Sequence, residues 1–182
     1  MRRFDLVVFD LGGVIVRLAA GWEDAHRLAG LSGEPPTDRA FRALLGDLAR
    51  RADGSVRASE YYERVAAASG SRYAPDDVRR IGHVWLRGEY DGVGRVFDAL
   101  DAAAVETAIL SNTTEDHWSR LAPESGVAEF PTVLRARRRF ASHLLGLVKP
   151  DPAIYRVVER ETGHTPERIL FFDDLAPNVE AA

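Results

Sequence analysis

Three short apolar runs divide the chain, and each of them stops at a polar residue. The runs are Leu6–Phe9 before Asp10, Ala108–Leu110 before Ser111, and Ile169–Phe172 before Asp173. Their hydrophobicity is continuous rather than alternating, which is typical of parallel strands that helices cover on both faces. A further short strand is expected at Phe140–Ser142. The pattern therefore predicts an α/β fold.

Between the first two strands lies a long stretch in which apolar residues recur with helical spacing. It predicts four helices, at residues 22–31, 38–50, 59–68 and 75–87. Four helices without an intervening strand are too many for one crossover connection, so we interpret residues 14–88 as an inserted helical-bundle cap. The alternative is that these helices are ordinary crossover helices of the sheet.

Residues 1–13 and 89–182 are then expected to form one discontinuous core domain. Its crossover helices are predicted at residues 93–100, 114–121 and 151–162. The sequence stops soon after the last predicted strand, which would leave that strand at an unprotected edge of the sheet. We therefore expect a shortened C-terminus, with one strand missing.

Composition excludes several classes of function. The 182 residues contain no cysteine, which excludes a disulfide scaffold, a thiolate metal site and a cysteine nucleophile. A net charge of −4 argues against nucleic acid as the main partner. No window offers the roughly 18 uninterrupted apolar residues of a membrane span, so no membrane partner is expected. A soluble cytoplasmic protein is the expectation, and its oligomeric state cannot be read from the sequence.

Polar residues at the ends of the predicted strands are the candidates for chemistry. Ligands of doubly wound sheets bind at the carboxyl ends of the strands, where this chain has Asp10, Ser111 and the Asp173–Asp174 pair. Each residue alone could simply end a strand or cap a helix, but their coincidence favours a site. Lys149 is the only lysine among 24 basic residues, which indicates a point-charge role that arginine fills less well.

The order of these residues resembles the four motifs of the haloacid dehalogenase superfamily of phosphatases and related hydrolases. The motifs read VFDLGGV from Val8, LSNT from Leu110, GLVKPD from Gly146, and FFDD from Phe171 with Asn178. The wording most resembles bacterial glucose-1-phosphate phosphatases and the phosphatase domains related to epoxide hydrolases. The resemblance implies a Rossmann-like three-layer core with a parallel sheet and an inserted helical-bundle cap.

The resemblance also implies a Mg²⁺-dependent phosphatase that acts on a small phosphorylated metabolite, most readily a sugar phosphate. Asp10 would be the nucleophile and form an aspartyl-phosphate that water then hydrolyses. Mg²⁺ would be held by Asp10, by the backbone carbonyl of Gly12 and by Asp174. Asp173, the remaining acidic residue of this metal site, would orient a metal-bound water or Lys149.

Phosphate binding is implied for a second group of atoms. Lys149 would contact both the nucleophile and the transferring phosphoryl oxygens, so that it counts with Asp10 as a catalytic residue. The Ser111 hydroxyl and the backbone N–H groups of Leu11 and Asn112 would complete the phosphate cradle.

Gly12 departs from the pattern of most phosphatases of the superfamily, which carry a second aspartate there as general acid and base. That proton transfer is typically worth ~10²–10⁴ in rate, and nothing in the motif replaces it. The substrate could have a better leaving group, such as a sugar 1-phosphate. Alternatively, His117 or a cap side chain substitutes, or the protein is nearly inactive.

For His117, an arginine cluster and the aromatic residues of the cap, the sequence allows both a functional and a purely structural interpretation. His117 either faces the site or is an ordinary surface residue, and the arginines of residues 135–139 either bind an anion or face water. Four aromatic residues of the cap either line a substrate pocket or pack its core: Trp22, Tyr61, Tyr62 and Trp85.

Two competing functions remain beside the phosphatase. A metal-free haloacid dehalogenase is disfavoured, because two adjacent carboxylates facing an uncharged substrate would be costly without a cation. A catalytically weak or silent binding protein is permitted by Gly12, while Asp10, Lys149 and Asp174 argue against it.

Overall fold

A parallel sheet forms the centre of the computed structural model, which describes residues 3–126 and 129–182. Across those residues its strand order is β5-β4-β1-β6, and all neighbouring strands run parallel. The strands are β1 (Leu6–Phe9), β4 (Glu106–Ser111), β5 (Arg138–Ala141) and β6 (Ile169–Phe172). The three apolar runs are thus strands, as predicted. β5 begins earlier than expected and ends at Ala141, because Ser142 already belongs to a helix.

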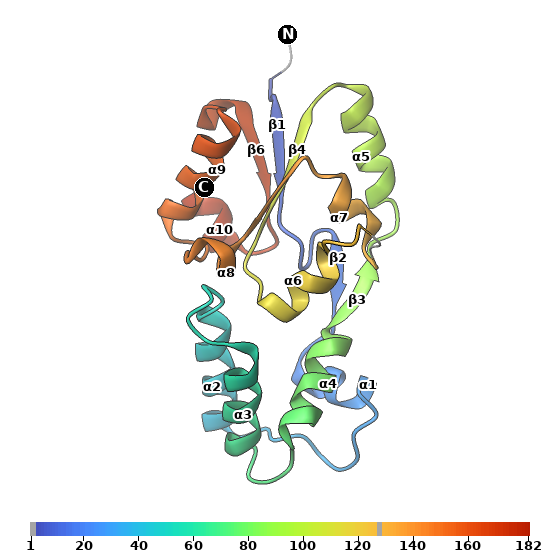
Figure 1. The fold of residues 1–182 in the computed structure, drawn as a ribbon, viewed down its shortest axis with the longest axis vertical. Helices are drawn as coiled ribbons and strands as arrows, with labels where there is room; N and C mark the ends of the chain where they lie inside the picture. The colour runs from blue at the N-terminus through green and yellow to red at the C-terminus, as the bar shows by residue number, and fades with distance from the viewer. Residues whose placement is uncertain (1–2, 127–128) are drawn as a thin grey trace.

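Helices cover both faces of this sheet, as the continuous hydrophobicity of its strands requires (Figure 1). Val7 and Phe9 of β1 pack against Phe97 and Val133, which belong to α5 (Val93–Ala102) and α7 (Pro131–Arg135). Leu6 and Val8 point to the other face, where α9 (Pro152–Thr162) supplies its buried residues. The remaining helices of this part are α6 (Glu115–Leu121), α8 (Ser142–Leu145), η1 (Pro166–Arg168) and α10 (Ala176–Ala181). The α/β class and the three-layer core are therefore confirmed.

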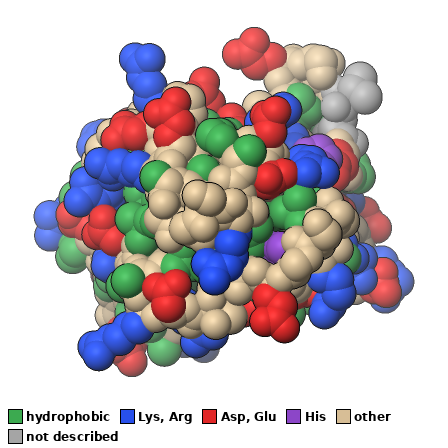
Figure 2. Space-filling model, turned by 90° about the horizontal axis from the view of Figure 1, so that it is seen from below, with side chains coloured by type: hydrophobic (Ala, Val, Ile, Leu, Met, Phe, Trp, Pro, Cys, Tyr) green, Lys and Arg blue, Asp and Glu red, His purple; other side chains and the backbone are tan. Residues whose placement is uncertain are grey.

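Four helices lie below the carboxyl ends of the strands in Figure 1 and form a bundle with a hydrophobic core of its own. They are α1 (Trp22–Leu28), α2 (Arg39–Arg50), α3 (Ala58–Ala68) and α4 (Pro75–Trp85). We call this bundle the cap. Its outer face, seen from below in Figure 2, carries acidic and basic side chains side by side. The domain boundaries at residues 14 and 88 stay a prediction.

An antiparallel pair of strands joins the cap to the core. β2 (Val16–Leu18) pairs with β3 (Leu86–Glu89), so the chain enters and leaves the cap through adjacent strands. Neither strand is predicted from the sequence pattern, because each is only three or four residues long and buries one residue. The helices predicted at 22–31 and 75–87 end earlier in the structure, at Leu28 and Trp85. Gly30 has a φ of +68° beyond the end of α1, and β3 begins directly after Trp85.

No helix within the described residues is long and apolar enough to cross a membrane.

Candidate active site

The parallel register brings the carboxyl ends of three strands together, and we call this end of the sheet the active-site edge. Phe9 of β1 lies level with Ile109 of β4 and Phe172 of β6, so the residues that follow these strands meet at the edge facing the cap. The backbone N–H of Asp10 donates to the carbonyl of Phe172 at 2.9 Å, which fixes Asp10 beside the residues after β6. The predicted meeting of strand ends is therefore present.

Lys149 lies at the centre of this edge, and its side chain is almost fully buried. Its ammonium nitrogen is 2.9 Å from Oδ1 of Asp10 and 2.6 Å from Oδ2 of Asp173, and it donates to the carbonyl of Leu110 at 3.0 Å. A buried ammonium needs this many partners, because an unpaired charge in the interior is strongly unfavourable. The single lysine of the chain thus links two of the carboxylates that the sequence singled out.

Asn112 holds the backbone of Lys149 from both sides. Its Oδ1 accepts from the Lys149 N–H at 2.8 Å, and its Nδ2 donates to the Lys149 carbonyl at 2.9 Å. The motif resemblance implied a role only for the backbone N–H of Asn112, and this use of its side chain was not predicted. The pairing of an amide side chain with a distant backbone leaves no periodic signal in the sequence.

Asp173 and Asp174 are adjacent but differently placed. The side chain of Asp173 is fully buried, and its Oδ1 accepts from the N–H of Leu175 at 2.9 Å and from Nδ2 of Asn178 at 2.8 Å. With Oδ2 paired to Lys149, both oxygens are in use. Asp174 is an exposed residue. Asp173 is therefore placed to orient Lys149, and Asp174 is freer to bind a cation.

The Asp10 carboxyl is buried and lies beside a single cation of the described residues. Its Oδ1 forms an ion pair with the Lys149 ammonium at 2.9 Å. Burial raises the pKa of Asp10 above its ordinary value, and the Lys149 charge opposes this shift only in part. A buried carboxyl whose pKa stays raised beside one cation favours a second cation in the adjoining space.

The chemistry of the donor set fits a divalent metal ion. Asp10, Asp173 and Asp174 each offer a carboxylate oxygen, and these oxygens lie within 4.8 Å of one another. Gly13, with a φ of +75°, makes room for them, because a Cβ at this position would lie 2.3 Å from Oδ2 of Asp174. Hard carboxylate oxygens are the ligands that Mg²⁺ prefers. A contribution from the Gly12 carbonyl stays a prediction.

The remaining phosphate-binding predictions rest on position alone. Ser111 is the buried last residue of β4, and Leu11 directly follows Asp10 with its side chain in the core. Both residues therefore lie at the edge that holds Asp10. Their contacts with phosphate stay predictions.

A cavity of about 300 Å³ lies between the cap and the core. We call it the cap–core cavity. The core contributes the loop after β4 and the start of α6, and the cap contributes most of the remaining wall. All four aromatic residues considered in the sequence line it: Trp22, Tyr61, Tyr62 and Trp85.

His117 also lines this cavity, but its ring is engaged in holding the cap. Its Nε2 lies 2.9 Å from the carbonyl of Gly82 in α4, so Nε2 carries the proton and donates it to that carbonyl. Burial lowers the pKa of His117 below its ordinary value, which favours the neutral ring. A neutral imidazole with its N–H already bound is a poor proton donor, which weakens the suggestion that His117 replaces the missing acid.

The arginines of residues 135–139 lie before and within β5, and the site lies at the opposite end of that strand. Arg135 is paired with Asp98 at 2.9 Å and Asp101 at 2.6 Å, and Arg137 with Glu106 at 2.6 Å. These exposed ion pairs favour the interpretation as a solvated surface.

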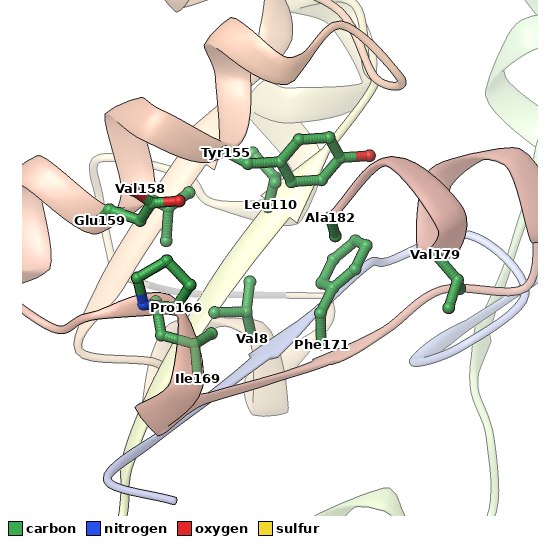
Figure 3. A pocket seen from close by; sticks show the side chains of 10 residues that line it. All are labelled: Val8, Leu110, Tyr155, Val158, Glu159, Pro166, Ile169, Phe171, Val179 and Ala182. Atoms are coloured by element: carbon green, nitrogen blue, oxygen red, sulfur yellow. The ribbon is translucent and has the colours of Figure 1, made fainter.

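A second cavity, of about 220 Å³, lies between β6, α9 and α10 (Figure 3). Its walls are mainly apolar side chains such as Val8, Ile169 and Phe171, with Glu159 at the margin. Its lining residues all belong to the core, on the face of the sheet that α9 covers. It is therefore separate from the cap–core cavity.

Comparison with known proteins agrees with this architecture. The family model of the haloacid dehalogenase-like hydrolases matches residues 4–182. A HAD family enzyme from Bacteroides thetaiotaomicron, solved with magnesium and inorganic phosphate, shares 17% identity at a TM-score of 0.76, over 98% of this chain and 88% of that one. A predicted HAD-like family hydrolase from Porphyromonas gingivalis shares 21% identity at 0.72, over 99% and 86%. Mouse acyl-CoA dehydrogenase family member 10 is 24% identical across the whole chain, which spans only 17% of that relative's length.

Proposed function

Because the chain belongs to the family of haloacid dehalogenase-like hydrolases, we propose that it is a Mg²⁺-dependent phosphatase that cleaves a small phosphorylated metabolite through an aspartyl-phosphate. The observation that carries the proposal is the buried carboxyl of Asp10 at the end of β1, whose Oδ1 lies 2.9 Å from the Lys149 ammonium. A buried carboxylate beside a fixed cation suits a nucleophile for phosphoryl transfer.

Each charged group of the site then has a defined role. Asp10 attacks phosphorus, and Lys149 binds the phosphoryl oxygens while it keeps the Asp10 carboxyl ionised against the effect of burial. Asp173 is a positioning residue that holds the Lys149 ammonium at 2.6 Å. Asp10, Asp174 and the Gly12 carbonyl would hold Mg²⁺, which supplies charge neutralisation between carboxylate and phosphate.

The substrate is restricted by what the site lacks. Gly12 offers no acid to the leaving group, and His117 has its N–H bound to Gly82. The departing oxygen must therefore leave without strong help from a proton donor. Two classes of metabolite meet this condition, namely sugar 1-phosphates, which the sequence resemblance favours, and esters of more acidic hydroxyl groups.

Phosphate release from acetyl phosphate tests the proposal, because this small substrate has a good leaving group and needs no particular pocket. We expect release that depends on Mg²⁺ and falls at least about 10³-fold in Asp10→Asn, since an amide oxygen is a poor nucleophile. Circular dichroism controls for folding. Near-normal turnover by folded Asp10→Asn would contradict the assignment. Halide release from a haloacid without metal would favour the dehalogenase, and inactivity on all phosphates would favour the binding protein.

The roles of the two adjacent aspartates are tested by a matched pair of variants. Asp174→Ala should raise the Mg²⁺ concentration for half-maximal rate far more than Asp173→Ala, because both Asp173 oxygens are already bound by protein groups. Asp173→Ala should instead lower kcat by releasing Lys149. The reverse order of Mg²⁺ dependence would show that the two roles are exchanged.

A further inference from the structure

The cap–core cavity is large enough for an aromatic molecule. Its volume of about 300 Å³ is roughly twice that of an engineered cavity of about 150 Å³ that holds benzene. Side chains from all four cap helices face it, among them Trp22 of α1, Tyr61 of α3 and Trp85 of α4. Flat aromatic walls favour a flat aromatic occupant, because ring pairs add to the free energy of apolar burial.

The polar groups of the cavity wall are mostly occupied by other protein groups. Asp116 is bound by the Tyr62 hydroxyl, and Arg51 lies 3.2 Å from Asp47. The N–H of His117 is bound to a carbonyl of α4, and the Asn112 amide holds Lys149. A sugar carries a hydroxyl on nearly every carbon, and each one buried without a partner costs free energy. This wall therefore suits an apolar group better than a sugar.

The cavity adjoins the site through Asn112, while Asp10 and Lys149 do not line it themselves. Asn112 and Thr113 of its wall directly follow Ser111 at the end of β4, and the Asn112 amide binds the backbone of Lys149. The ester group of a phosphate held at Asp10 would have to extend past Asn112 to reach the aromatic side chains. The leaving group, rather than a remote part of the substrate, would occupy the cavity.

We infer that the substrate is an aryl phosphate whose aromatic leaving group fills the cap–core cavity, an inference that rests on the proposed phosphatase function. Two independent observations support an aryl phosphate, namely the aromatic wall of the cavity and the absence of an acidic side chain at Gly12. A phenolic oxygen, with a pKa near 10 as in tyrosine, leaves as an anion far more readily than an alkoxide. An aryl ester therefore needs no general acid.

The reaction balances without a further reactant. An Asp10 oxygen forms a bond to phosphorus, the bond between phosphorus and the aryl oxygen breaks, and its electron pair leaves on the aryl oxide. Water then attacks phosphorus, releases the Asp10 carboxylate and yields inorganic phosphate. The proton that this water loses is taken up by the aryl oxide, so the products are a phenol and phosphate.

Two aryl phosphates of nearly equal leaving-group acidity separate the effect of the cavity from that of the leaving group. We expect kcat/KM for 2-naphthyl phosphate to exceed that for phenyl phosphate by about 10-fold, because the second ring buries additional apolar surface. Both should exceed glucose 1-phosphate. Equal values for the two aryl esters, or a faster glucose 1-phosphate, would overturn the inference.

Adjacent leucines of α2 provide a matched pair of variants. Leu44 and Leu45 are both partly buried, but only Leu45 lines the cavity. Leu45→Asn should lower the ratio of kcat/KM for naphthyl phosphate to that for acetyl phosphate by about 10-fold, and Leu44→Asn should leave this ratio within about twofold. Ala49→Phe, at an exposed position of α2 that also lines the cavity, should lower it without burying a polar group.

Failure of this inference and failure of the proposed function give different results. Hydrolysis of acetyl phosphate that requires Asp10, with no preference for naphthyl over phenyl phosphate, would overturn the aryl substrate and leave the phosphatase standing. An unchanged ratio in folded Leu45→Asn and Ala49→Phe would do the same. Absence of Asp10-dependent hydrolysis for every phosphate would overturn both.

Discussion

At the scale of single residues, the two glycines that follow Leu11 differ in what their positions allow. Gly13 has a φ of +75°, and a Cβ there would lie 2.3 Å from Oδ2 of Asp174. Gly12 is outside the left-handed region, and the nearest contact of a Cβ there would be Cδ1 of the exposed Leu18 side chain, at 2.9 Å. Glycine is therefore required at position 13, both by the positive φ and by the lack of space for a Cβ. At position 12 the backbone conformation does not require glycine.

Gly13→Ala and Gly12→Ala should differ in their effect on the metal site. Gly13→Ala combines backbone strain of about 1 kcal/mol with displacement of the Asp174 carboxylate, so the Mg²⁺ requirement should rise at least about 10-fold. Gly12→Ala should change it by less than about threefold, because the end of the Leu18 side chain can move. Titration of Mg²⁺ against phosphate release measures both, and equal effects would contradict this distinction.

Gly12→Asp should restore a proton donor, since the backbone at this position accepts a side chain. The rate on an alkyl phosphate should rise by about 10-fold or more, and the rate on phenyl phosphate should change little, because only the alkoxide needs protonation. A plot of log kcat against leaving-group pKa measures this effect, and its slope should be less steep for Gly12→Asp than for the wild type. A wild-type rate that is indifferent to leaving-group pKa while chemistry is rate-limiting would mean that an acid elsewhere already acts.

At the scale of elements, α6 is the part of the core that binds the cap. Asp116 binds the Tyr62 hydroxyl of α3, His117 binds the carbonyl of Gly82 in α4, and Arg120 donates to the carbonyl of His83. Ser142 of α8 adds a contact to the carbonyl of Ala52. These contacts close the cap–core cavity, so its shape depends on the docking of α6.

Protonation of His117 should weaken this docking. Burial lowers the pKa of His117 in the folded protein below 6.5, so the unfolded chain takes up the proton first. The stability that His117 contributes is therefore complete above about pH 6.5 and is lost as the pH falls below it. Between about pH 7.5 and 5.5, metal-free wild type should lose about 2–4 °C more in Tm than His117→Gln.

His83→Gln, at an exposed position of α4, is the control for this measurement. It should retain the pH dependence of the wild type. An identical loss of Tm in wild type and His117→Gln would show that His117 does not titrate in this way.

The sequence predicted the buried strands well and the short elements poorly. Leu6–Phe9 and Ile169–Phe172 are strands with the predicted bounds, because a strand covered on both faces must be apolar throughout. β2, β3, α7 and α8 were missed, since three to five residues are too few to show a period. The strand ends supplied the carboxylates, but the Asn112 contact with Lys149 depends on a fold that joins residues 37 positions apart.

At the scale of the whole molecule, the charged groups and the apolar cavity come from different parts of the chain. The sheet edge holds the charged groups, with Asp10 and Lys149 at its centre. The cap supplies most of the apolar wall of the cap–core cavity. Sequence motifs could predict the first part because it follows strand ends, whereas the cavity depends on how four helices without a motif pack against the core. The chemistry of the reaction is thus more accessible from the sequence than the identity of the substrate.

Direct detection of the phosphorylated nucleophile tests the central claim. Wild-type protein turning over acetyl phosphate with Mg²⁺ would be quenched in acid, reduced with borohydride to convert an aspartyl-phosphate to homoserine, and digested with trypsin. The account predicts this conversion at Asp10, in the peptide between Arg3 and Arg17, and its absence in Asp10→Asn. Asp5 lies in the same peptide as an internal control that should stay unmodified. Steady phosphate release without modification at Asp10, or with modification at another residue, would contradict the account.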